Sequence, residues 1–142
     1  MRMRVLGIDL GKVRIGTALS DYGGRMALPS VTLDAKGLSK NVAAVADLAA
    51  KSEAVLIVVG MPVRMDGTVG PAAEFTERFV QALKEGTDIE VETWDERLSS
   101  SQANKLMISA DVSRKDRKGA VDSMAAAIML QSYLDARRSG GA

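Results

Sequence analysis

The chain has 142 residues and a formal net charge of +1, with 46% hydrophobic and 26% charged residues. These proportions are typical of one globular domain and exclude a disordered chain. No apolar run approaches the ~18 residues that a membrane-spanning helix needs, so we expect a soluble, cytoplasmic protein without membrane contacts. Cysteine and histidine are both absent, which excludes thiolate and imidazole metal sites and leaves carboxylates, hydroxyls, lysine and arginine for any chemistry.

The first third of the chain predicts three strands joined by tight turns. Residues 5–10 are almost entirely apolar until Asp9, and residues 14–20 alternate between apolar and polar. Gly11-Lys12 suits a turn between these two strands, and Tyr22-Gly23-Gly24 suits another before a strand over 27–33. Strands connected in this way form an antiparallel meander.

The middle of the chain predicts two crossovers. Apolar residues at helical spacing over 38–49 precede the continuous apolar run 55–59, which is typical of a strand buried on both faces. The segment 60–70 is rich in Gly, Pro and Asp and predicts a loop, and Pro71 suits the start of a second helix. A fifth strand follows over 89–94.

The last third predicts helices. One is expected over 98–110 and another over 121–130, separated by the polar, basic segment 113–119, and the tail over 136–142 looks frayed. The order of elements predicts an α/β fold in which a mixed five-stranded sheet is covered by helices on both faces. We expect residues 1–138 to form a single domain and residues 139–142 to be a flexible tail.

Asp9 interrupts an otherwise apolar strand. A buried carboxylate is costly unless it meets a cation or several hydrogen-bond donors. From this position alone, two interpretations stay open: a turn aspartate that accepts backbone amides near Gly11, or a ligand in an acidic site.

Four groups of residues resemble one known family. They are Gly7-Ile8-Asp9-Leu10-Gly11 with Arg14-Ile15-Gly16; Val59-Gly60-Met61-Pro62 with Asp66-Gly67; Asp95-Glu96-Arg97-Leu98-Ser99-Ser100; and Asp122-Ser123-Met124-Ala125-Ala126 with Gln131. In this order they resemble the motifs of the YqgF/RuvX-type family of RNase H-like, Holliday-junction-resolvase-like nucleases. The first group alone also resembles the phosphate hairpin of sugar kinases and Hsp70-like ATPases.

The resemblance implies an RNase H-like nuclease domain with an acidic site. Asp9, Glu96 and Asp122 would be the catalytic residues and the ligands of Mg²⁺ or Mn²⁺, which prefer oxygen ligands. In the expected fold the first strand is central, the strand ending near Trp94 lies beside it, and the last helix packs across the sheet. Asp95 is the substitute for Glu96, because adjacent strand residues point to opposite faces and the end of the strand is open. We expect Asp122 in the first turn of its helix.

Several other residues are candidates for binding nucleic acid. Arg14 could neutralise a phosphate or be a solvated strand residue, Ser99 and Ser100 could bind a phosphate or cap a helix, and the basic cluster could hold a strand or be a solvated loop. The full set is Arg14, Arg64, Arg97, Ser99, Ser100, Arg114, Lys115, Arg117 and Lys118.

The function implied by the resemblance is metal-dependent endonuclease activity on structured nucleic acid. The resemblance implies two possible substrates. The first is the 5′ end of precursor 16S ribosomal RNA, whose processing belongs to ribosome biogenesis, and the second is the Holliday junction of DNA recombination. Junction resolution predicts a homodimer, because two symmetric strands are cut. The alternatives are a non-catalytic nucleic-acid or ribosome-binding module and, less favoured, an actin-like-fold phosphotransferase, which needs two such lobes around a nucleotide.

Overall fold

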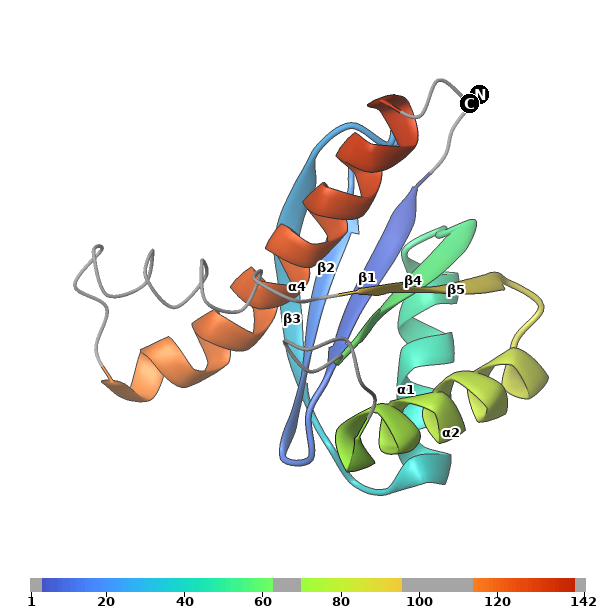
Figure 1. Ribbon diagram of the computed structural model, residues 1–142, viewed down its shortest axis with the longest axis vertical. Helices are drawn as coiled ribbons and strands as arrows, with labels where there is room; N and C mark the ends of the chain where they lie inside the picture. Colours follow the sequence, from blue (N-terminus) through green and yellow to red (C-terminus); the bar gives the residue numbers. More distant parts are fainter. Residues whose placement is uncertain (1–3, 63–69, 96–113, 140–142) are drawn as a thin grey trace.

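The computed structural model describes residues 4–62, 70–95 and 114–139, which form a mixed sheet with helices on both faces (Figure 1). The first three strands are β1 (Val5–Leu10), β2 (Arg14–Ser20) and β3 (Ala27–Asp34). They pair in antiparallel order, β1 with β2 and β2 with β3. The predicted meander is confirmed, with boundaries that differ only at the end of β3.

Two crossovers complete the sheet. Helix α1 (Leu38–Lys51) leads to β4 (Leu56–Met61), which is parallel to β1, and α2 (Pro71–Gly86) leads to β5 (Glu90–Asp95), which is parallel to β4. The strand order is β3-β2-β1-β4-β5, so β1 is central as predicted. Strand β4 runs two residues further than expected, through Gly60 and Met61.

The expected neighbour of β1 was wrong. Strand β5, which ends near Trp94, lies at the edge of the sheet, and β4 separates it from β1. The reason is the side-chain pattern of the two strands: β4 is buried along nearly its whole length, whereas β5 carries the charged residues Glu90 and Glu92. Continuous apolar strands occupy sheet interiors, and strands with charges tolerate an edge.

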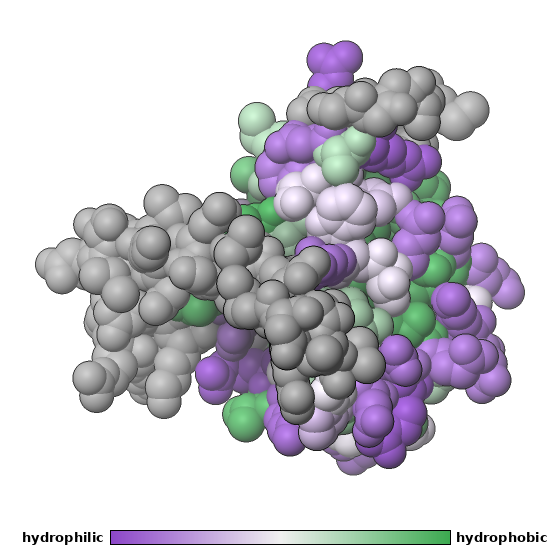
Figure 2. Space-filling model, in the orientation of Figure 1, coloured by the Kyte–Doolittle hydropathy of each residue, from purple (hydrophilic) through white to green (hydrophobic). Residues whose placement is uncertain are grey.

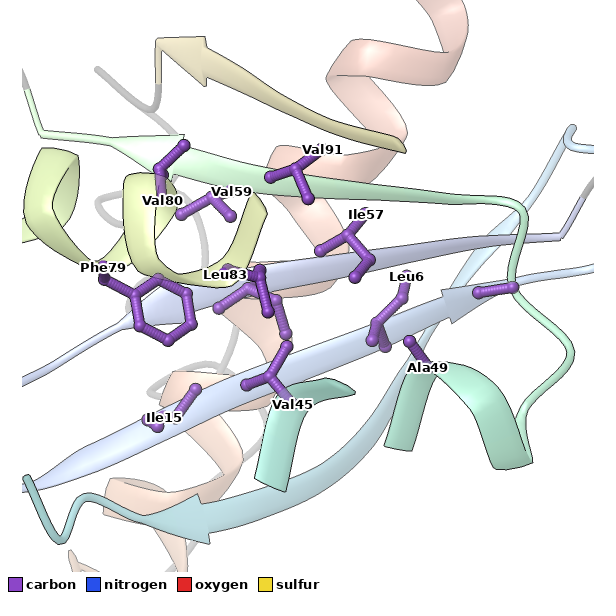
Figure 3. Close-up of a cluster of buried hydrophobic side chains, with 12 residues drawn as sticks. Leu6, Ile15, Val45, Ala49, Ile57, Val59, Phe79, Val80, Leu83 and Val91 are labelled. Atoms are coloured by element: carbon purple, nitrogen blue, oxygen red, sulfur yellow. The ribbon is translucent and has the colours of Figure 1, made fainter. Parts of the chain in front are cut away.

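Helices α1 and α2 cover one face of the sheet. Figure 3 shows Phe79 and Leu83 of α2 and Val45 of α1 against Leu6, Ile15, Ile57 and Val59 of the strands. Leu6 and Ile8 point to this side of β1. The apolar faces of the two helices therefore form one buried layer with this side of the sheet.

Helix α4 (Arg114–Ser139) covers the opposite face (Figure 1). Its Ala126, Met129, Leu130 and Leu134 pack with Val5 and Val58 of the strands. The sequence placed a loop over 113–119 and a frayed tail from 136, but the helix already includes Arg114 and continues to Ser139. Gly119 costs only about 1 kcal/mol in a helix interior relative to alanine, which is too little by itself to end a helix. The helix expected over 98–110 lies outside the described residues.

Figure 2 shows one face, on which hydrophilic side chains lie among smaller groups of hydrophobic ones. Large exposed hydrophobic residues include Val13, Met26, Leu28 and Val31. Across the described ranges, no helix is both long and apolar enough to cross a membrane.

Candidate active site

Asp9 lies near the end of the central strand, on the side of the sheet that α4 covers. Val5 belongs to the hydrophobic cluster on that side, and a side chain added to Gly7 would come within 2.9 Å of Leu130 Cβ in α4. Alternate residues of a strand share a face, so Asp9 faces the same way. It is half-buried, at the point where the apolar strand meets solvent.

Asp122 is held beside this position by a backbone contact. Gly16 of β2 is the cross-strand partner of Asp9, and a Cβ built on Gly16 would lie only 2.0 Å from the carbonyl oxygen of Asp122. Helix α4 therefore presses its backbone onto β2 directly next to Asp9. Residues separated by more than a hundred positions in the chain occupy neighbouring places on one face of the sheet.

The expected place of Asp122 in its helix was wrong. Asp122 lies eight residues after the first residue of α4, Arg114, which is more than two turns inside the helix. The partial charge of a helix end acts only within the first turn. Packing of α4 against Gly16, and not the helix terminus, positions this carboxylate.

Arg14 is the direct partner of Asp122. Its Nε atom donates a hydrogen bond to Asp122 Oδ2 at 2.6 Å, and the two side chains are 34% and 27% exposed. Arg14 begins β2, and its carbonyl oxygen accepts the amide of Gly11 at 3.0 Å. The tight β1–β2 turn therefore places this arginine beside Asp122.

Asp95 is the last residue of the edge strand β5. Glu92 and Trp94 share the other face of β5, and both contact α4. The Tyr133 hydroxyl donates a hydrogen bond to Glu92, and the Trp94 indole N–H donates one to Ser132 Oγ at 3.2 Å. Val91 packs in the cluster on the α1–α2 side. By this alternation Asp95 belongs to the face opposite Asp9.

A small aromatic group joins β5 to α4. The rings of Trp94 and Tyr133 meet edge to face with centroids 5.4 Å apart. Burial of the phenol, followed by its hydrogen bond to Glu92, raises the pKa of Tyr133 to about 12. Trp94 packs partly against the cluster beneath α4.

The other predicted site residues lie outside the described residues or side chains. Glu96, Arg97, Ser99, Ser100 and Arg64 fall in ranges that the structure does not describe. The backbone of Arg114, Lys115, Arg117 and Lys118 is in α4, and their side chains are not described. Among the described residues no three acidic side chains form a group that could hold a metal ion.

Two contacts near the site were not predicted from the sequence. One is the close approach of Asp122 to Gly16, and the other is the Arg14–Asp122 ion pair. A glycine inside a strand signals a close backbone approach, so Gly16 carried a usable signal. The identity of the approaching element depends on tertiary packing.

Comparisons with known proteins show the family of the chain. A family model described as RuvX, Holliday junction resolvase, matches residues 3–136. A relative from Syntrophomonas wolfei, provisionally named a pre-16S rRNA nuclease, is 45% identical over 133 residues and 94% of each chain. A relative from a Geobacillus species with the same provisional name is 43% identical over 138 residues, which cover 96% of this chain and all of the relative.

Solved structures support the same fold. Thermus thermophilus RuvC bound to a Holliday junction matches with a TM-score of 0.58 and 15% identity, covering 96% of each chain. Fowlpox virus resolvase in its Holliday junction complex matches with a TM-score of 0.57 and 13% identity, covering 95% of this chain and 99% of that one. The fold is the predicted RNase H-like fold, and the YqgF/RuvX resemblance is confirmed. Because the family model matches nearly the whole chain and the relatives are this similar, the chain belongs to the RuvX family of Holliday junction resolvases.

Proposed function

We propose that the chain is a metal-dependent endonuclease that hydrolyses phosphodiester bonds in structured nucleic acid. The observation that carries this proposal is the position of Asp9 and Asp122, which the central strand and α4 bring to one face of the sheet at Gly16. A nuclease role is also supported by the family and by the names of its curated members. The cytoplasm is the proposed location.

Asp9, Asp122 and Glu96 are the proposed ligands of Mg²⁺ or Mn²⁺. Their donor atoms are all carboxylate oxygens, which these ions prefer over nitrogen and sulfur. Alternation along β5 assigns Asp95 to the opposite face, which favours Glu96, the next residue in the chain, over Asp95. When bound, the metal would supply an activated water and stabilise the charge of the leaving oxygen.

This chain's own residues contribute orientation and charge. The half-buried setting of Asp9 limits its motion, and the contact at Gly16 fixes the backbone of Asp122. Arg14 supplies a positive charge next to Asp122 that could also meet a phosphate. The basic positions Arg114, Lys115, Arg117 and Lys118 precede Asp122 on the same helix, and they could hold the backbone of the substrate, together with Arg64, Arg97, Ser99 and Ser100.

Precursor 16S rRNA is the first proposed substrate, because the curated relatives are named for it. The Holliday junction is the second, because it is the substrate in the family's description. Resolution of a junction would require a homodimer, since two symmetric strands must be cut.

The test compares wild type with Asp9→Asn on four-way DNA junctions and on precursor rRNA, each with Mg²⁺, Mn²⁺ or EDTA. Asp47→Asn, purified in parallel, is the matched control: Asp47 is exposed on α1, where it pairs with Lys51 at 3.0 Å. We expect cutting by wild type and by Asp47→Asn that requires metal, and a loss of at least a hundredfold in Asp9→Asn, in line with removal of a metal ligand.

Equal cutting by wild type and Asp9→Asn would contradict the proposal, and so would cutting that persists in EDTA. The contrast with Asp47→Asn guards against a contaminating nuclease, because all three proteins carry the same contaminants. Cutting of one substrate alone would decide between ribosomal RNA and the junction.

A further inference from the structure

The Arg14–Asp122 ion pair joins two groups that the proposed nuclease needs for different partners. A metal ion would require the Asp122 carboxylate, and a phosphodiester would attract the Arg14 guanidinium. We propose that Arg14 exchanges partners. In the free protein it pairs with Asp122, and when a substrate phosphate binds Arg14 in place of Asp122, the carboxylate is released to bind the metal. This inference rests on the proposed function and adds to it a coupling between metal binding and substrate binding.

The geometry permits such an exchange. The backbones of both residues are held, Arg14 by the Gly11 amide and Asp122 by the contact with Gly16. Their side chains are about one third exposed, so an ion or a phosphate can reach the pair from solvent. Breaking the contact therefore needs only side-chain rotation and no movement of β2 or α4.

The guanidinium is suited to the second partner. It contacts Asp122 through Nε, and no hydrogen bond to a described residue occupies its Nη atoms. Arginine binds phosphate through two parallel hydrogen bonds, a geometry that a single contact to one carboxylate oxygen does not use. A phosphodiester would thus compete with Asp122 for the same cation.

The exchange also has an electrostatic reason. A guanidinium at 2.6 Å from Asp122 Oδ2 neutralises that carboxylate and repels a divalent cation placed at the same site. Once a phosphate has drawn the guanidinium away, the negative charge of the carboxylate is no longer compensated and can attract the metal. Metal and substrate should therefore bind with positive coupling, and by linkage each raises the affinity for the other.

A simpler role for Arg14 makes the opposite prediction. If Arg14 only oriented Asp122 as a ligand, its removal would weaken metal binding. Under exchange, removal of its charge strengthens metal binding in the free protein. The sign of one measurement separates the two roles.

The first experiment titrates Mn²⁺ into the full-length proteins without nucleic acid, at constant pH, by calorimetry and by the Mn²⁺ electron paramagnetic resonance signal. Arg14→Gln removes the charge, Arg14→Lys keeps it, and Lys84→Gln removes the same charge from an exposed position on α2, a helix on the other side of the sheet. We expect Arg14→Gln to bind Mn²⁺ about tenfold more tightly than wild type, a typical size for coupling between sites. Arg14→Lys and Lys84→Gln should stay close to wild type.

Equal or weaker Mn²⁺ binding by Arg14→Gln would overturn the exchange. If Asp9→Asn at the same time binds Mn²⁺ more weakly than wild type, the proposed metal site stands and only the exchange fails. If neither wild type nor Arg14→Gln binds Mn²⁺, both proposals fail. Circular dichroism melting of each variant confirms that the compared proteins are folded.

The second experiment measures the coupling itself. The affinity for a four-way DNA junction is determined with Ca²⁺ and with EDTA, for wild type and for Arg14→Gln. The factor by which Ca²⁺ raises the affinity should be several times larger in wild type, because only wild type has an ion pair to exchange. The same factor in both proteins would overturn the inference.

Discussion

Gly16 allows α4 to lie against β2 at backbone distance. A methyl group at this position would come within 2.0 Å of the Asp122 carbonyl oxygen, and neither backbone can yield as a flexible side chain would. The part of α4 around Asp122 would have to move away from β2, and the Asp122 side chain would move with it. The residue therefore controls the distance between the two aspartates of the proposed site.

We predict that Gly16→Ala lowers nuclease activity by more than tenfold and destabilises the fold by about 1–3 kcal/mol, the usual cost of overpacking. Urea unfolding and cutting assays measure the two effects. Gly23→Ala is the matched control, because its added methyl group would meet only the Asp21 carboxylate at 3.4 Å, an ordinary contact. Unchanged activity in Gly16→Ala would show that the approach of α4 to β2 does not position Asp122.

Because of Tyr133, the free energy of unfolding should fall at alkaline pH. Its pKa is raised to about 12 in the folded protein, whereas an unfolded tyrosine titrates near pH ~10. Between these values the unfolded state has lost the proton and the folded state keeps it, so the free energy of unfolding falls as pH rises. The contribution is fully present below pH ~10 and is lost by about pH 12.

We expect wild type to lose on the order of 2 kcal/mol more than Tyr133→Phe over that interval. Chemical denaturation at several pH values measures the difference between the two proteins, which cancels the titration of lysines and other groups. Parallel pH profiles of the two proteins would contradict this assignment of the pKa.

Among the secondary-structure elements, α4 has the most direct influence on the site. Its residue Gln131 connects α4 to the β2–β3 turn by hydrogen bonds. The Gln131 side-chain oxygen accepts the amide of Ala27 at 2.9 Å, and its nitrogen donates to the Arg25 carbonyl at 2.9 Å. The same nitrogen donates to Asp135 one turn later, also at 2.9 Å. One side chain thus satisfies two backbone groups of a neighbouring element.

Gln131→Ala should leave those backbone groups without their partners and cost about 1–3 kcal/mol. Hydrogen exchange at the Ala27 amide should accelerate as the turn detaches from α4. Gln81→Ala on the exposed side of α2 is the control for loss of a glutamine side chain. Slow exchange at Ala27 in the Gln131 variant would mean that other contacts hold the turn.

At the scale of the whole molecule, two hydrophobic layers share one sheet. The α1–α2 layer includes Leu6 and Ile8 of β1, and the α4 layer includes Val5 of the same strand. Strand β4 likewise contributes to both layers. Loss of either layer removes the support of the central strands, so the described elements should unfold together.

The single tryptophan tests this cooperativity. Trp94 packs on the α4 side, while Phe79 is buried on the other side. We predict that Phe79→Leu, which should cost about 1 kcal/mol, shifts the Trp94 fluorescence transition and the far-ultraviolet dichroism transition by the same amount. A fluorescence transition that stays in place would show that the two layers unfold separately.

Local patterns were sufficient for much of this fold. The apolar run of β1, the turn glycines and the two amphipathic helices each depend on residues close in sequence, and their predicted boundaries agree with the structure within a few residues. The errors lie where distant segments compete. The place of β5 depends on which strand can be buried on both faces. Helix α4 begins before Gly119, although glycine and the polar residues beside it favour a loop.

For the proposed site, the sequence by itself limited the possible chemistry: without histidine or cysteine, carboxylates are the candidate metal ligands, and Asp9 in an apolar strand was the first such candidate. Only the tertiary structure decided which groups meet. It placed Asp122 against the strand partner of Asp9, assigned Asp95 to the other face and paired Arg14 with Asp122. The sequence shows which chemical groups are present. The distances between groups that are remote in the chain depend on how closely α4 packs on the sheet, which it approaches at two glycines, Gly7 and Gly16.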